Sequence, residues 1–395
     1  MKDTLKRRIG PGLLTAYGVG VMVGAGIYVL VGAVVADAGV WAPLSFLLAG
    51  LVAAPTALSY AEFSTRLPEA AGEALYVSKG LKLPFLAIIV GLAIVLAGTI
   101  SAAAVLRGGA GYLTAVTGFA MTPSIVVMGL ALMAVAILGV LESLALAAVF
   151  TVVEVIGLAL VIYAGMSADP TADFSVPAEI VWSGVATGAV LAFFAFIGFE
   201  DIVNMAEEVS SPERTMPRAI LWSLVITTLL YVLVSFAAVR AVPLGLLGKS
   251  EQPLALVWST VHGGNAAFLS VIAVAAALNG VLAQIVMASR VLFGLGKRHS
   301  GLGVFHHTHA RFGTPLLATV LIGVAVISGA VLLPLSDLAE TTSILLLAVF
   351  VLVNAALVAM KLRQPDAPFR VAMAVPIFGL IAALAALTVT TGVGQ

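Results

Sequence analysis

The stretch GVGVMVGAGIY, residues Gly18–Tyr28, decides how the rest of the chain is interpreted. It lies in an apolar segment long enough to cross a membrane, yet four of its first nine residues are glycine. Each glycine inside a helix costs about 1 kcal/mol relative to alanine. One interpretation is tight helix packing, with Gly20 and Gly24 as a small-xxx-small pair. The other is an interrupted helix whose unwound backbone faces a ligand. This stretch alone leaves both open.

A second stretch, FFAFIGFED at Phe193–Asp201, favours the interruption. Gly198 stands among aromatic residues and is followed by two carboxylates, Glu200 and Asp201. Ionisable residues at that depth usually face a cavity or a partner. A helix that stops near Gly198 and restarts places both carboxylates at a new helix N-terminus, where the dipole stabilises negative charge. The alternative is that they lie near the mouth of an ordinary span.

Composition fixes the class of protein. Of 395 residues, 62% are apolar and 10% are charged, and the mean hydropathy is +1.17. A soluble domain carries about 25% charged residues, so most of this exterior must face a lipid bilayer. The formal net charge is zero, which argues against nucleic acid as a partner. The chain has no cysteine, which excludes disulfides and thiolate metal sites. We therefore predict an all-α polytopic membrane protein without a cofactor.

The apolar pattern predicts eleven spans, each of roughly twenty residues or more. They are expected at 10–36, 42–65, 84–106, 123–140, 144–166, 181–206, 217–242, 266–292, 315–334, 337–360 and 371–391. The region 107–122 either extends the third span or forms a loop, and Pro217 is expected in the first turn of its span. The two glycine-interrupted spans, first and sixth, occupy corresponding places in two five-span halves. Such pairing is typical of transporters with inverted repeats.

The basic residues predict the orientation. With the N-terminus in the cytoplasm, sixteen basic residues lie inside and only Arg107, Arg240 and Lys249 lie outside. This bias follows the positive-inside rule and favours the plasma (inner) membrane, with the C-terminus outside. The longest outer loops, 167–180 and 243–265, have room for small vestibule helices only.

Three segments carry a resemblance to a known family. Residues 20–28, 193–218 and 289–315 resemble, in order, the first helix, the sixth helix with its following loop, and the eighth helix with its loop in the amino acid–polyamine–organocation transporters. The resemblance covers nearly the whole chain. It implies a LeuT-like fold with two inverted repeats, 10–166 and 181–360, followed by an extra helix at 371–391. It also implies alternating access to a site at the two breaks.

The same resemblance implies a substrate site for an amino acid. Its carboxylate is expected on backbone amides of the first break, which suits a half-helix N-terminus. Its amine is expected on carbonyls around both breaks, with Phe196 or Phe199 as an aromatic cap. The predicted substrate-binding residues are Val21, Gly24, Ala25, Gly26, Ile27, Phe196, Ile197, Gly198 and Phe199.

Glu154 lies in the middle of the fifth span, where many relatives of this family carry a lysine. A charged carboxylate at the bilayer centre costs about 2.5–3.5 kcal/mol, which favours a functional role in binding a proton or a cation. The alternative is a neutral carboxyl that ties helices together. Asn279 is a candidate oxygen ligand beside it, although hydrogen bonding between helices is the favoured explanation for an asparagine at this position. We favour proton linkage over sodium because the eighth span lacks a pair of hydroxyls at that depth.

Other functions find less support in the sequence. Four histidines in the loop 299–309 have no carboxylate near them, which disfavours a metal site. No nucleotide-binding loop, ion-channel filter or catalytic motif is present. The leading prediction is a secondary active transporter of amino acids, proton-linked or exchanging, and not an enzyme. An organic amine or polyamine carrier, with Glu154, Glu200 or Asp201 pairing the amine, is the alternative.

Overall fold

The computed structural model describes residues 9–68, 72–138, 144–171, 179–206, 209–264, 266–298, 300–309 and 314–390. Within these ranges the regular structure is helical, apart from one isolated bridge between Ile9 and Val209. The prediction of an all-α membrane protein is confirmed. Large apolar side chains such as Leu51, Val127 and Leu332 stay exposed on the outside of the bundle, as a lipid-facing surface requires.

Long helices make up most of the molecule. Their bounds are α1 Pro11–Ala38, α2 Ala42–Arg66, α4 Leu86–Thr117, α5 Met121–Leu138, α6 Leu144–Ser167, α8 Pro212–Ala241, α11 Ala267–Arg298, α12 Leu316–Leu332, α13 Leu335–Arg363 and α14 Ala374–Thr390. Shorter elements are η1 Gly39–Trp41, α3 Gly72–Leu81, α7 Trp182–Phe194, η2 Glu200–Met205, α9 Leu244–Leu247, α10 Pro253–His262 and η3 Ser300–Phe305. Each predicted span coincides with one long helix, except the sixth, which is α7, a turn and η2.

The bounds of the helices test three expectations for the spans and loops. Helix α4 continues to Thr117 and ends at Gly118 in the left-handed conformation, so most of the region 107–122 extends the third span. The loop 243–265 holds the small helices α9 and α10, as its length suggested. The expectation for Pro217 was wrong. Helix α8 begins at Pro212, whose missing N–H costs nothing in the first turn, and Pro217 lies inside the helix.

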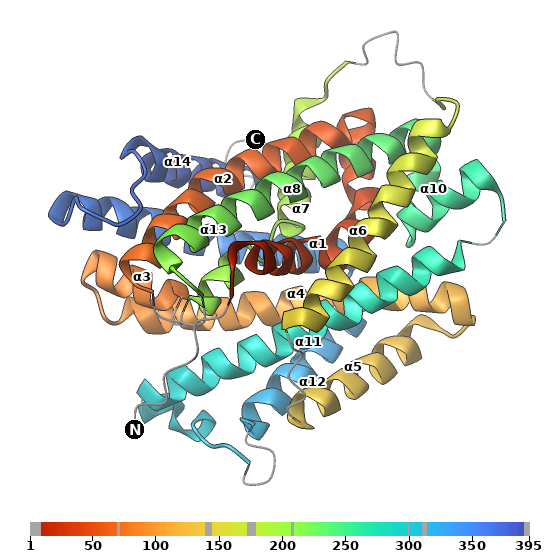
Figure 1. Cartoon of the computed structure of the whole chain (residues 1–395). Helices are drawn as coiled ribbons and strands as arrows, with labels where there is room; N and C mark the ends of the chain where they lie inside the picture. The colour runs from red at the N-terminus through yellow and green to blue at the C-terminus, as the bar shows by residue number, and fades with distance from the viewer. Residues whose placement is uncertain are drawn as a thin grey trace.

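Helix α1 crosses the centre of the bundle, where it packs against α6, α7, α8 and α11 (Figure 1). Small residues allow these close approaches. A Cβ atom on Gly20 would lie 1.9 Å from the Oγ1 atom of Thr151 on α6, so only glycine fits there. A Cβ atom on Gly165 of α6 would likewise lie 2.4 Å from the carbonyl oxygen of Ala237 on α8. Glycine thus permits close packing of α1 against α6 and of α6 against α8.

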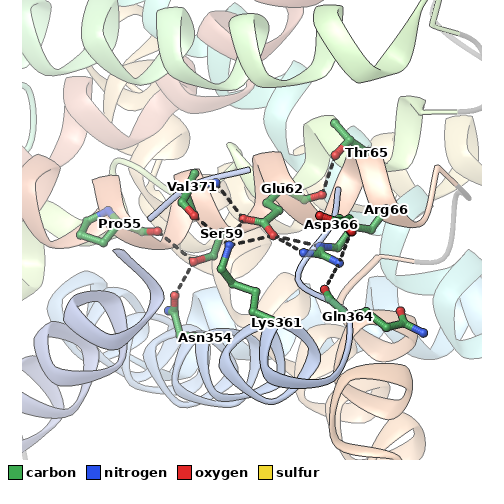
Figure 2. A network of polar contacts seen from close by, with 10 residues as sticks. All are labelled: Pro55, Ser59, Glu62, Thr65, Arg66, Asn354, Lys361, Gln364, Asp366 and Val371. Carbon is green, nitrogen blue, oxygen red and sulfur yellow. Dashed lines mark hydrogen bonds and ion pairs between the residues drawn. The ribbon is translucent and has the colours of Figure 1, made fainter. Parts of the chain in front are cut away.

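A buried ionic network joins α2, α13 and the segment before α14 (Figure 2). Glu62 is fully buried, and its carboxylate lies 2.6 Å from an Nη atom of Arg66 and 2.7 Å from the Nζ atom of Lys361. It also accepts a hydrogen bond from the backbone N–H of Val371 at 2.9 Å. Both oxygens are therefore engaged, which is the condition under which a buried charge is tolerated.

Candidate functional site

The first break lies at Gly24. This residue has φ 0° and ψ −162° inside an otherwise continuous α1, so the helix changes course there. A Cβ atom added to Gly24 would meet no heavy atom within 4 Å, so open space adjoins the break. The interruption is therefore seen at Gly24, while Gly20 shows the close packing that the other interpretation expected. A second helical segment of α1 begins after Gly24.

The second break lies between α7 and η2. Helix α7 ends at Phe194, and Gly198 has φ +125°, a conformation that favours glycine over any residue with a Cβ atom. The chain then restarts as η2 at Glu200, with Asp201 next to it in the first turn. The Glu200 carboxylate accepts a hydrogen bond from the backbone N–H of Gly198 at 2.9 Å. The predicted restart with two acidic residues at its beginning is confirmed.

The two breaks touch each other. A Cβ atom on Gly198 would lie 2.6 Å from Cγ1 and 3.1 Å from the carbonyl carbon of Val21. A Cβ atom on Gly26 would lie 3.2 Å from the Cα atom of Ala195. Residues far apart in the sequence, which we predicted to form one site, are therefore neighbours. Of the other predicted residues, Ile27, Phe196 and Phe199 are fully buried, Ile197 is half-buried, and Ala25 belongs to the same turn as Gly24.

Tyr231 on α8 binds both breaks, and the sequence analysis did not single it out. Its hydroxyl lies 2.6 Å from the carbonyl oxygen of Met22 and 2.8 Å from that of Ala195. A hydroxyl has one proton, so it donates to one of these carbonyls at a time. Its ring lies 5.1 Å from the ring of Phe196, edge to face. A lone tyrosine inside an apolar helix was the available signal, because a buried hydroxyl needs a partner.

Glu154 reaches the same region from α6. Its side chain is 2% exposed and lies close enough to Tyr28 and Tyr231 for electrostatic interaction. Tyr28 donates a hydrogen bond to the backbone carbonyl of Glu154 at 2.7 Å, and Tyr112 of α4 donates to that of Tyr28 at 2.5 Å. Asn279 is half-buried on α11, which packs against both α1 and α6. The coupling roles of Glu154 and Asn279 stay predictions.

A third acidic group, Glu73, lies near the second break. It belongs to the short helix α3, outside the predicted spans, and is 7% exposed. Burial and, to a lesser extent, the nearby Asp201 raise the pKa of Glu73 from its ordinary 4.5 to about 7. The fully buried Tyr60 and Tyr76 pack around it, with their ring centroids 6.0 Å apart. Sequence reasoning missed Glu73 because it read the segment as an ordinary connecting loop.

Interrupted helices that meet at the centre of a membrane bundle are the architecture of a secondary transporter. The sequence agrees with that class over almost its full length. A model of the amino acid permease family matches residues 13–394, and the chain belongs to this family.

Relatives of known name share about the same extent of sequence. The chain is 28% identical to the branched-chain amino acid permease BcaP of Bacillus subtilis, across 93% of this chain and 83% of that protein. It is 32% identical to the chloroplastic cationic amino acid transporter 9 of Arabidopsis thaliana, across 78% of this chain and 58% of that protein. It is 29% identical to the methylthioribose transporter of Bacillus subtilis, across 96% and 87%. All three names describe carriers of small polar solutes.

Proposed function

We propose that the chain is a secondary transporter that carries amino acids across the membrane by alternating access. The observation that supports this most is the contact between the two breaks, Val21 against Gly198 and Gly26 against Ala195, in a member of the amino acid permease family. Backbone groups released by such breaks suit a solute that carries both a carboxylate and an ammonium group.

Each end of the solute has a matching partner. The second segment of α1 starts after Gly24, and its first N–H groups suit the carboxylate, because a helix N-terminus attracts anions. The carbonyls of Met22 and Ala195 suit the ammonium group. Both lie within hydrogen-bond distance of the Tyr231 hydroxyl, which donates to one of them at a time, so an ammonium group that binds there competes with Tyr231 for these oxygens. Binding would thereby loosen the link between α8 and the two breaks.

Orientation, repeats and coupling complete the proposal. The N-terminus is cytoplasmic and the C-terminus outside, in the plasma (inner) membrane, and the two halves 10–166 and 181–360 are inverted repeats. Glu154 carries a coupled proton, with exchange of substrates as the alternative, because its buried carboxylate lies beside Tyr28 and Tyr231 at the breaks. Asn279 contributes an oxygen only if a metal cation is coupled.

An organic amine carrier is a second candidate, favoured by the buried carboxylates of Glu154 and Glu200. The two candidates differ in what they require of the solute. If backbone amides after Gly24 bind a carboxylate, amines without one compete poorly with free amino acids. Equal competition by a decarboxylated analogue would favour the amine carrier.

The test is uptake of labelled leucine and lysine into proteoliposomes, with methylthioribose and a diamine as comparison solutes. A ligand that binds the folded state also stabilises it, by about 2.7 kcal/mol at a hundred times its Kd. Thermal unfolding of the purified protein therefore gives an independent reading. We expect uptake and thermal stabilisation by at least one amino acid. Uptake of a comparison solute alone, with no response to any amino acid, overturns the proposal.

A further inference from the structure

A cavity of about 250 Å³ lies next to the first break, at the opposite end of α13 from the Glu62 network. Val29 and Ala33 of α1 form one wall, and Val29 is two residues beyond Ile27 of the predicted site. By the orientation proposed above, this end faces outside. Its volume is near the lower limit for ligand pockets, which suits one small solute.

Arg107 is the feature of this cavity that most needs an explanation. It is the only charged residue in the 32 residues of α4 and is half-buried in the cavity wall. One Nη atom donates to the backbone carbonyl of Ala330 at 2.8 Å. Arg107 forms no ion pair with any residue that the structure describes. A guanidinium group has five N–H donors, so most of them remain available to a ligand. Planar, paired donors of this kind match a carboxylate.

A carboxylate and a second basic residue line the cavity together with Arg107. Glu251 and Lys249, from the loop between α9 and α10, line the same cavity. An Oε atom of Glu251 would lie 3.8 Å from a Cβ atom on Gly111, which is one helical turn beyond Arg107 on the same face of α4. Like Arg107, both form no ion pair within the described ranges. Two opposite charges that face one cavity and leave a gap can each bind one end of a zwitterion.

We propose that this cavity is an entry site for the free zwitterion, in which Arg107 binds the carboxylate and Glu251 the ammonium group before the solute reaches the breaks. The inference rests on the proposed function and adds a preference to it. Arg107 and Lys249 outnumber Glu251, so the cavity carries one net positive charge. Such a field attracts the carboxylate and repels a solute with a cationic side chain. The entry site therefore favours amino acids with uncharged side chains.

The first experiment compares Arg107→Gln with Arg240→Gln. Arg240 is a matched control: it is also half-buried, is also assigned to the outer side, and donates to a backbone carbonyl, that of Ala168, at 3.1 Å. It does not line the cavity. In proteoliposomes we expect Arg107→Gln to raise the KM for leucine about threefold to tenfold, as the loss of one ordinary hydrogen bond predicts, with kcat nearly unchanged. Arg107→Lys should recover part of the loss.

The outcomes separate the two proposals. Equal KM changes in the Arg107 and Arg240 variants, or a fall in kcat alone for Arg107→Gln, overturn the entry site while wild-type uptake still supports amino acid transport. A wild-type protein without amino acid uptake or stabilisation overturns the proposed function, and the entry site with it.

Charge reversal and salt test the preference without relying on Arg107. Lys249→Glu changes the cavity from one net positive to one net negative charge, and we expect the lysine-to-leucine uptake ratio to rise about threefold or more. In the wild type the same ratio should rise as outside salt increases from about 10 to 300 mM, because salt screens the field that repels lysine. The membrane potential is held at zero in both measurements. A ratio that responds to neither change contradicts the preference.

Discussion

Charged side chains gather beside both ends of α13, and they differ in how their charges are paired. At the C-terminal end, Lys361 and Arg66 enclose the carboxylate of Glu62, and all three charges have partners within 3 Å (Figure 2). At the N-terminal end, about 38 Å away at 1.5 Å per residue, Ser336 borders a cavity whose arginine has one backbone partner and no carboxylate. The charges of the Glu62 network are paired with one another, whereas the charges that line the cavity form no ion pair among the described residues.

This difference separates charges that hold the fold from charges that await a solute. The desolvation of a buried ion is offset only when its partners satisfy it, so a complete network resists any change to its members. An incomplete cluster gains its partner from outside, and its loss alters binding more than stability. The predictions below test that division, and each measures unfolding of the purified protein in detergent.

The largest effect is expected for Lys361→Met. The change leaves the buried Glu62 carboxylate without its closest-lying ammonium group and the carbonyl of Val371 without the donor now 2.7 Å away. Removal of one partner from a buried pair costs about 3–5 kcal/mol. The double variant Glu62→Gln with Lys361→Met should lose less than the sum of the two single variants, because neither member of this pair is then left charged without the other. Additive losses would show that the pair is not a unit.

A smaller effect is expected at the second break, between the two clusters. Gly198→Ala introduces a Cβ atom 2.6 Å from Val21 at a residue with φ +125°. Strain and the clash together predict a loss of about 2–3 kcal/mol and of most uptake. Gly118→Ala is the control, because Gly118 also has a positive φ but no heavy atom within 4 Å of its Cβ position. Similar losses in both variants would show that backbone strain causes the loss and that the contact with Val21 does not contribute.

The spans and both breaks could be predicted because their signals are local. Apolar length defines a span, and dense glycine in the first span or glycine followed by carboxylates in the sixth indicates a break. Pairing between distant residues has no such signal. The ion pair of Glu62 and Lys361 joins residues 299 apart, and the bond from Tyr231 to Met22 joins residues 209 apart. Each partner alone resembles an ordinary charged or aromatic residue of a membrane helix.

Burial outside the spans was equally hard to predict. Glu73 follows a helix end in a polar stretch, where a glutamate is normally solvated. Only the packing of α3 against α4, α13 and η2 removes it from water. The set of residues that lines the entry cavity was also beyond prediction from the sequence. The sequence marked Arg107 as one of three outer basic residues, but its place in the same cavity as Glu251 depends on how the loop after α9 packs near α4.

Glu73 makes stability depend on pH. Its pKa is raised to about 7 by burial, so between pH 4.5 and 7 the folded protein holds a proton that the unfolded chain releases. Stability therefore falls as pH rises through that window and is lowest above pH 7. Glu73→Gln removes this loss, and its advantage over the wild type should grow by about 1–3 kcal/mol from pH 5 to pH 8.

The acidic and phenolic neighbours of Glu73 set the control for that experiment. Asp201, Glu200, Tyr60 and Tyr76 all interact with it, and a carboxylate among them could carry the same pH dependence. Asp201→Asn should therefore reduce the pH dependence in part, because one repulsive charge is gone. If the stability difference between Glu73→Gln and the wild type stays constant with pH, a group other than Glu73 causes the pH dependence.

The smallest effect on stability is expected for Arg107→Gln, and this prediction decides whether the comparison holds. Arg107 makes one hydrogen bond to a backbone carbonyl and no ion pair within the described residues, so its removal should change the free energy of unfolding by less than about 1 kcal/mol. The same variant should need about three to ten times more of a neutral amino acid than the wild type to reach a given stabilisation, because binding and unfolding are linked. Lys361→Met should show the reverse pattern, a large loss in the absence of solute and the usual increment when solute is added. If Arg107→Gln instead unfolds as readily as Lys361→Met, the unpaired arginine supports the fold, and a charge without a partner is no guide to where this protein receives its solute.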